Sequence, residues 1–185
     1  MATGWKRIAR RIRVPLGFAF AVFFFWLARP NWLFLVLSLL LVVPGLLLRG
    51  YASGYVKKNA ELTVTGPYAY TRNPLYLGSM LIAFGFAVAS RSVWIAAVLI
   101  VLFGAIYIPV IRAEEEYLRS SFPGFDDYAA RVPRLIPRIT PSRQPGEAAG
   151  VFAATLYQKH REYNALLGAV GMYAALILKL IFVMR

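Results

Sequence analysis

Long apolar runs separated by short charged stretches restrict the fold of this chain more than any other feature. The runs cover residues 14–28, 31–48, 75–90, 92–111 and 164–184. About 20 helical residues cross a bilayer, and helices satisfy their own backbone hydrogen bonds there. The apolar share of 59% is well above that of an average soluble domain. The sequence therefore predicts an all-α integral membrane protein of about five transmembrane helices, forming a single domain over residues 1–185.

The basic residues are distributed unevenly between the two sides that five spans would create. Seventeen of the 21 basic residues lie before the first run, between the second and third, or between the fourth and fifth. All eight acidic residues fall on that same side. The positive-inside rule therefore predicts a multi-pass protein with a cytoplasmic N-terminus, of the kind found in a bacterial inner membrane. We expect the net charge of +13 to face lipid headgroups; the scattered basic residues argue against nucleic-acid binding.

Cysteine is absent and His160 is the only histidine. The chain therefore has no thiolate nucleophile, no disulfide framework and no set of histidines for a metal site. Its chemistry must come from arginine, tyrosine, carboxylate and amide side chains, and we predict no metal centre.

A polar stretch from Gly66 to Gly78 runs directly into the third apolar segment. Pro74 suits the first turn of a helix, which makes Asn73 a candidate N-cap whose side chain accepts backbone N–H bonds. Helix N-termini also attract anions such as carboxylates. Tyr68 and Tyr76 suit the aromatic belt of a membrane interface. The stretch therefore allows both a structural cap and a ligand site.

A second polar cluster, Glu114-Glu115-Glu116, follows the fourth apolar run. It allows two interpretations: a solvated helix end paired with Arg112 and Arg119, or a site at which a carboxylate binds a cation or a ribose. Pro109 predicts a kink that would re-aim this cluster. The two clusters would then face each other across one site at the membrane edge.

Together these motifs resemble the isoprenylcysteine carboxyl methyltransferase family, whose core phospholipid methyltransferases share. The pattern is Gly66-Pro67-Tyr68, then Arg72-Asn73-Pro74-Leu75-Tyr76-Leu77-Gly78, then Glu114-Glu115 with Leu118 and Phe122, then Tyr128, Val132-Pro133 and Pro137. The resemblance covers about residues 49–138. It implies a membrane enzyme that moves a methyl group from S-adenosylmethionine to a lipophilic acceptor at the cytosolic interface. The acceptor would be of the carboxylate type or a lipid headgroup, carried by a lipophilic small molecule, a lipidated substrate or a membrane lipid.

The resemblance also assigns roles to particular residues. The cofactor pocket would be formed by the loop before the third span and the segment after the fourth. The cofactor would contact Leu62, Tyr68, Asn73, Pro74, Tyr76, Glu114 and Glu115. We expect Arg72, and secondarily Arg112, to orient an anionic group.

Two positions depart from the family pattern. Asn73 stands where the family has histidine, so an acid–base role is lost while hydrogen bonding remains. Val110 stands where the prenylcysteine enzymes have a substrate-binding arginine, which argues against a prenylcysteine carboxylate as substrate.

Two other functions remain open at this stage. One is an NADPH-dependent membrane reductase of the sterol-reductase type, and the other is a non-catalytic lipid-binding membrane protein. Small residues between 168 and 175 allow close helix packing, either within the chain or in a homodimer.

Overall fold

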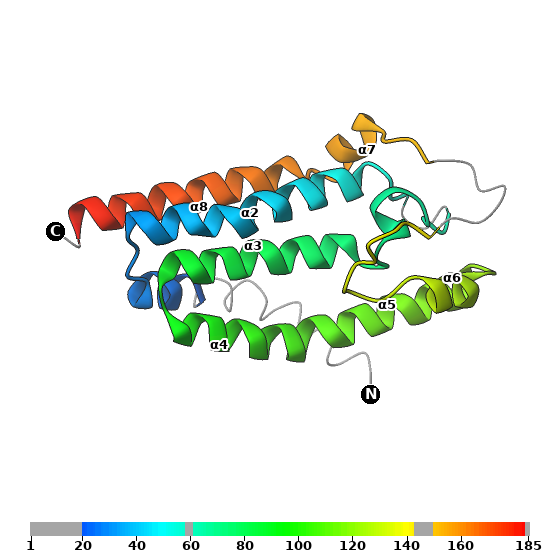
Figure 1. The fold of residues 1–185 in the computed structure, drawn as a ribbon, viewed down its shortest axis with the longest axis horizontal. Coiled ribbons are helices and arrows are strands. Elements are labelled where there is room, and N and C mark those ends of the chain that lie inside the picture. Colours follow the sequence, from blue (N-terminus) through cyan, green and yellow to red (C-terminus); the bar gives the residue numbers. More distant parts are fainter. Residues whose placement is uncertain (1–19, 58–60, 143–149, 184–185) are drawn as a thin grey trace.

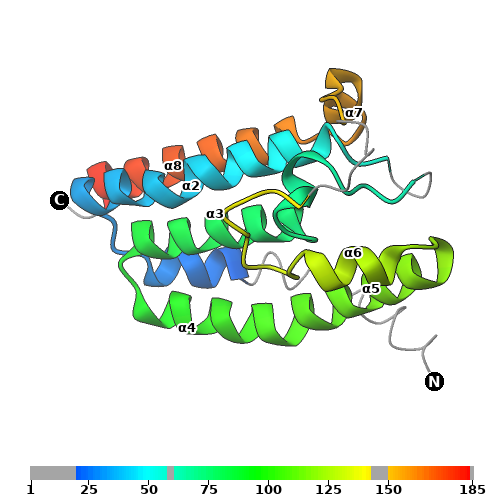
Figure 2. The same ribbon diagram turned by 45° about the vertical axis from the view of Figure 1, so that its right-hand side comes forward.

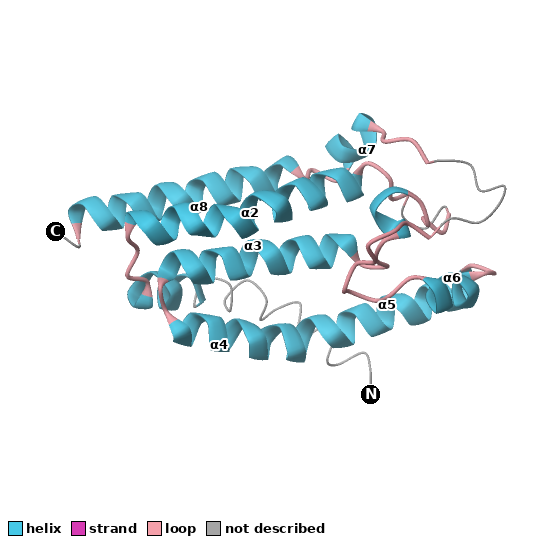
Figure 3. Ribbon diagram, viewed as in Figure 1, coloured by secondary structure: helices cyan, strands magenta, loops and turns pink. Residues whose placement is uncertain are grey.

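A computed structural model describes residues 20–57, 61–142 and 150–183. Within these ranges the regular structure is helical and there is no strand (Figure 3). Residues 20–27 form a short helix. The other elements are α2 (Trp32–Ser53), η1 (Gly66–Ala69), α3 (Pro74–Ser90), α4 (Val93–Leu102), η2 (Phe103–Tyr107), α5 (Ile108–Ser121), α6 (Phe125–Arg131), α7 (Ala154–Lys159) and α8 (Tyr163–Phe182).

The long helices lie side by side and alternate in direction (Figure 1). A loop that contains η1 joins α2 to α3, a short turn joins α3 to α4, and α8 returns beside α2, as the turned view also shows (Figure 2). Consequently η1, α6 and α7 all gather at one end of the bundle. We call this the polar end; the turns at 28–31 and 91–92 form the opposite end.

Three helices are long and apolar enough to cross a membrane. They are α2 with 22 residues, the continuous helix Val93–Ser121 with 29, and α8 with 20. The apolar helix α3 has 17 residues and falls short of that length. The predicted first span, 14–28, lies partly outside the described residues. The described residues therefore confirm an all-helical architecture with three candidate membrane spans, and the count of five spans stays a prediction.

Glycines allow α2 and α3 to pack with their backbones in close approach. A Cβ built on Gly78 would lie 2.8 Å from the carbonyl oxygen of Gly45, and the converse distance is also 2.8 Å. At Gly85 a Cβ would lie 2.5 Å from Val42 Cγ2. Small residues at such crossings increase van der Waals contact between helices, which stabilises packing in a bilayer. This glycine-lined contact between α2 and α3, which we call the apolar seam, positions the start of α3, where the polar loop ends.

The fourth apolar run continues as a helix beyond the boundary predicted at residue 111. A π-helical turn, η2, precedes Pro109, and α5 then extends to Ser121. Proline lacks an N–H and its ring crowds the carbonyl four residues earlier, so a wider turn accommodates it without ending the helix. The glutamates at 114–116 therefore lie within α5 rather than after it.

Candidate functional site

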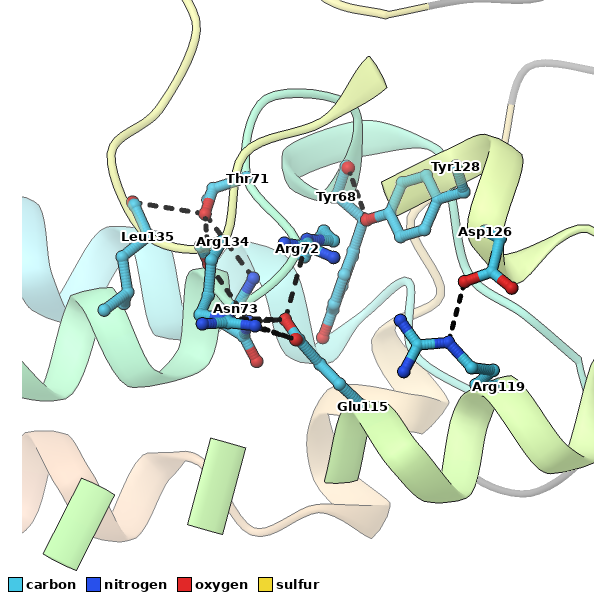
Figure 4. A network of polar contacts seen from close by, with 10 residues as sticks. All are labelled: Tyr68, Thr71, Arg72, Asn73, Glu115, Arg119, Asp126, Tyr128, Arg134 and Leu135. Atoms are coloured by element: carbon cyan, nitrogen blue, oxygen red, sulfur yellow. Dashed lines mark hydrogen bonds and ion pairs between the residues drawn. The ribbon is translucent and has the colours of Figure 1, made fainter. Parts of the chain in front are cut away.

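The segment that follows α6 is hydrogen-bonded along the loop that precedes α3. The amide of Arg72 donates to the carbonyl of Pro133 at 2.9 Å, and the amide of Arg138 donates to the carbonyl of Tyr70 at 2.9 Å. The hydroxyl of Tyr128 donates to the carbonyl of Tyr68 at 2.8 Å (Figure 4). These bonds place the loop 66–73 between α5 and the segment 132–142.

Glu115 is the centre of a buried charge network (Figure 4). Its side chain is 6% exposed and accepts from Arg134 Nη2 at 2.7 Å and from Arg134 Nε at 3.0 and 3.2 Å. Arg72 Nε lies 3.5 Å from Glu115 Oε1. Two guanidinium groups thus compensate the charge of one buried carboxylate. A buried carboxylate without such partners would strongly destabilise the folded protein.

Asn73 takes part in this network, and its expected capping role is wrong. It occupies the N-cap position of α3, yet its side chain makes no capping hydrogen bond. Its Nδ2 instead donates to the carbonyl of Arg134 at 3.0 Å and to Glu115 Oε1 at 3.4 Å. An amide can donate to both acceptors at once, so the side chain ties the start of α3 to the segment after α6.

Of the two interpretations of the glutamate cluster, the one that pairs it with Arg112 and Arg119 is not borne out among the described residues. Arg119 Nε instead donates to Asp126 at 2.7 Å across the turn between α5 and α6. Arg112 is exposed on α5 and makes no ion pair within the described ranges. The partner of Glu115 is Arg134, 19 residues further along the chain.

Glu114 lies in a different environment from its neighbour. It is exposed, and its Oε2 accepts a hydrogen bond of 2.8 Å from the hydroxyl of Tyr76. The Tyr76 ring contacts Tyr107 edge to face, with ring centres 5.6 Å apart. The structure therefore joins residues from the two predicted halves of the site, 38 positions apart in sequence. A solvent-accessible carboxylate beside an aromatic ring can accept hydrogen bonds from a ligand.

The remaining predicted cofactor residues surround this pair without all being accessible. Pro74 is fully buried at the first turn of α3. Tyr68 is 8% exposed. Leu62 packs against the apolar cluster of Phe125, Tyr128 and Val132.

Burial raises the pKa of two tyrosines at the polar end above its usual value near 10. Burial is the main cause for Tyr68, with smaller contributions from Tyr128, Glu114 and Glu162. Burial is also the main cause for Tyr128. Both hydroxyls therefore remain protonated donors at neutral pH. The hydrogen bond to Glu115 raises the pKa of Arg134, so this guanidinium stays charged.

Sequence reasoning missed a second ion pair, between Arg49 at the end of α2 and Glu162 before α8. Its two hydrogen bonds measure 2.9 and 3.0 Å, and the side chains are 24% and 10% exposed. Arg49 also donates to the carbonyl of Leu75 and the hydroxyl of Ser79 in α3. No local spacing signals a pair 113 residues apart; the only hint was an arginine in an apolar helix end.

The sequence comparisons identify related proteins. Residues 33–124 match the family model described as phospholipid methyltransferase. The nickel-cobalt-cadmium resistance protein NccN of Alcaligenes xylosoxydans xylosoxydans is 41% identical over 90 residues, 49% of this chain and 41% of that protein. The cobalt-zinc-cadmium resistance protein CzcN of Cupriavidus metallidurans is 36% identical over 110 residues, 60% of this chain and 49% of that protein. The chain thus aligns with less than half the length of these relatives, and no solved structure matches it.

The matched region contains the parts of the site that the structure joins. It runs from α2 through α5 and includes Tyr76, Glu114 and Glu115. It covers about half of the 185 residues. The resemblance inferred from the motifs is confirmed: this chain belongs to the phospholipid methyltransferase family.

Proposed function

We propose that this protein transfers a methyl group from S-adenosylmethionine to a lipophilic acceptor at the membrane boundary of its polar end. The observation that carries the proposal is the hydrogen bond of 2.8 Å between Tyr76 and Glu114. It joins two motifs that the family resemblance assigns to one cofactor site. The adjacent Glu115 network holds those motifs in place.

The polar groups of the site fit the functional groups of S-adenosylmethionine. Arg72 Nε is buried, and no acceptor among the described residues meets hydrogen-bond geometry with it. A buried donor of this kind suits a carboxylate. The exposed carboxylate of Glu114 suits an ammonium group or ribose hydroxyls. The half-buried ring of Tyr76 offers an aromatic face for a sulfonium.

When bound, S-adenosylmethionine supplies a methyl group that its sulfonium has already activated. The residues of this chain then need only bind, orient and exclude water, and orientation alone can supply about 7–11 kcal/mol at best. We assign Glu114 and Tyr76 to cofactor binding, and Arg72 to orienting an anionic atom, with the exposed Arg112 second. We assign Glu115 a positioning role, because its carboxylate oxygens already form ion pairs with Arg134 and Arg72. Carboxyl, amine, thiol and phenol groups all remain possible acceptors.

We further propose a multi-pass inner-membrane protein with a cytoplasmic N-terminus and the polar end in the cytoplasm. This follows the charge distribution of the sequence. Homodimerisation through α8 remains a prediction; a Cβ on Gly168 or Gly171 would meet no described atom within 4 Å, so that face is open.

The names of the two relatives point to metal resistance. In the described ranges, no group of three or more histidine, aspartate and glutamate side chains is placed to hold a metal ion. We extend to this chain the methyl transfer of its family and carry over no metal-related role from the relatives.

Calorimetric titration of the detergent-purified protein tests the proposal. S-adenosylmethionine and S-adenosylhomocysteine should bind, and Glu114→Ala should weaken binding at least about tenfold through the lost charge-assisted hydrogen bonds. Glu116→Ala is the matched control, because Glu116 is also an exposed glutamate of α5. It should bind like the wild type.

The other outcomes distinguish the alternative functions. A folded protein that binds neither sulfur ligand would contradict the proposal. Binding of a nicotinamide dinucleotide instead would favour the reductase. Binding of neither class would favour a non-catalytic lipid-binding protein.

A further inference from the structure

Three basic residues lie at the opposite end of the bundle, and no carboxylate of the described residues lies there. Arg29 and Arg91 are exposed in its two turns, and Lys179 lies in the last turn of α8. All eight acidic residues of the chain lie between residues 61 and 162. Those within the described ranges are in the polar-end loops, in α5 and α6, or before α8.

Contacts connect the segments of the chain that carry these three basic residues. The amide of Arg29 donates to the carbonyl of Ser90 at 2.8 Å, which joins the two turns. Lys179 Nζ donates to the carbonyl of Phe25, four residues before Arg29. Arg91 Cζ lies 5.1 Å from the centre of the Phe34 ring in α2. These contacts bring together, at this end, three parts of the chain that each carry a cation. We call Arg29, Arg91 and Lys179 the cluster.

Helix ends of both kinds lie at this end. Asn31 caps the N-terminus of α2 and Ser92 that of α4, each with its own side chain. The helix 20–27, α3 and α8 end here with their C-termini. Because helix N-termini and C-termini carry opposite partial charges, the attraction for an anion comes from the basic side chains.

Three exposed tryptophans lie at the same end of the bundle as the cluster. Trp26, Trp32 and Trp94 are 77%, 59% and 68% exposed, and they flank the two turns. Tryptophan concentrates at the level of the lipid headgroups. The cations beside these rings are therefore at the depth of lipid phosphates.

From this charge and depth we propose that Arg29, Arg91 and Lys179 form a binding site for the headgroup of an anionic phospholipid, in the leaflet opposite the methyltransferase site. The positive charge of the cluster complements such a headgroup, while the three exposed rings contact its acyl chains. This inference is independent of the methyl acceptor and of cofactor binding.

Quenching of tryptophan fluorescence tests this proposal on the full chain. Trp5→Phe removes the fourth tryptophan, so that emission comes from the three at this end. The protein is reconstituted into phosphatidylcholine vesicles with a minority of phosphatidylglycerol, and bromine is placed on one lipid class or the other. Brominated phosphatidylglycerol should quench more than brominated phosphatidylcholine at equal mole fraction, with each cation contributing about fivefold to the preference.

A variant with Arg29, Arg91 and Lys179 all changed to glutamine should lose the preference. A variant with Lys57, Arg119 and Lys159 changed to glutamine removes the same charge from exposed positions at the polar end, and should keep it. Equal quenching by both lipids, retention of the preference in the first variant, or equal loss in both variants would overturn the proposal. If the triple variant does not fold, Arg91→Gln alone should lower the preference about fivefold, and an unchanged preference would overturn it.

Discussion

Glu114 and Glu115 are adjacent in sequence and lie in opposite environments. Glu115 faces the loop and the segment after α6, where Arg134, Arg72 and Asn73 surround it. Glu114 faces outward, and its described partner is the hydroxyl of Tyr76. One residue along α5 rotates a side chain by about 100°, which is enough to separate the two environments.

The difference in burial assigns the two glutamates different roles: Glu115 supports the structure of the site, and Glu114 binds the ligand. The oxygens of the buried carboxylate already interact with two arginines, so little capacity is left for a ligand. Removing this carboxylate leaves those arginines without their ion-pair partner. An exposed carboxylate with one hydrogen bond can exchange that bond at little cost. We therefore expect loss of Glu115 to affect folding first, and loss of Glu114 to affect binding alone.

Glu115→Ala tests the structural half of the comparison and should have the largest effect. It leaves Arg72 and part of Arg134 uncompensated, and breaking a buried pair costs roughly 3 kcal/mol. Thermal unfolding in detergent should show a clearly lowered midpoint. A change in the free energy of unfolding below about 0.5 kcal/mol, the size expected for a surface substitution, would contradict the assigned role.

Gly78→Ala tests whether the close packing of α2 on α3 contributes to the stability of the protein as strongly as the ion pairs do. The new Cβ would lie 2.8 Å from the carbonyl of Gly45, and overpacking costs about 2 kcal/mol. Gly168→Ala is the matched control, since its Cβ would meet no described atom within 4 Å. Equal unfolding midpoints for the two variants would contradict the close approach of α2 and α3.

Arg134→Ala should destabilise less than Glu115→Ala, because Glu115 keeps Arg72 and Asn73. The Arg134 side chain is 43% exposed, so solvent screens its charge and the cost falls to roughly 1–2 kcal/mol. Hydrogen exchange should accelerate in residues 132–142 more than in α3. Uniform acceleration, or none, would show that the pair does not hold this segment.

Tyr128→Phe should have the smallest effect on stability and a distinct dependence on pH. It removes the hydrogen bond to the carbonyl of Tyr68, worth about 1 kcal/mol. Because burial raises the pKa of Tyr128, the unfolded chain loses that proton first as the pH rises above about 10. Wild-type stability should therefore fall above pH 10, and less steeply in the variant. Parallel pH profiles would contradict the burial of this hydroxyl.

The helical membrane architecture was predictable because hydrophobicity and length determine it locally. The end of the fourth apolar run was not, because η2 accommodates Pro109 and lets a polar segment continue the helix. The packing of α3 was not predictable either, since its 17 residues lie against α2 through glycines far apart in the sequence.

At the site, sequence reasoning identified the two motifs but not how they are held together. Tyr76 and Glu114 were both named, and the structure joins them. Asn73 was expected to cap α3, yet its amide bonds the carbonyl of Arg134. The partners of Glu115 and Arg49 depend on how distant segments pack, and no periodicity or spacing encodes that.

The claim that Glu115 supports the fold while Glu114 binds the ligand has a direct test. It compares the thermal unfolding midpoints of Glu114→Ala and Glu115→Ala with and without S-adenosylhomocysteine. A ligand that binds the native state raises its midpoint. We predict a near-native midpoint without the ligand-induced rise for Glu114→Ala, and a strongly lowered midpoint without ligand for Glu115→Ala. A full ligand-induced rise in Glu114→Ala, or equal loss of stability in both variants, would contradict the account.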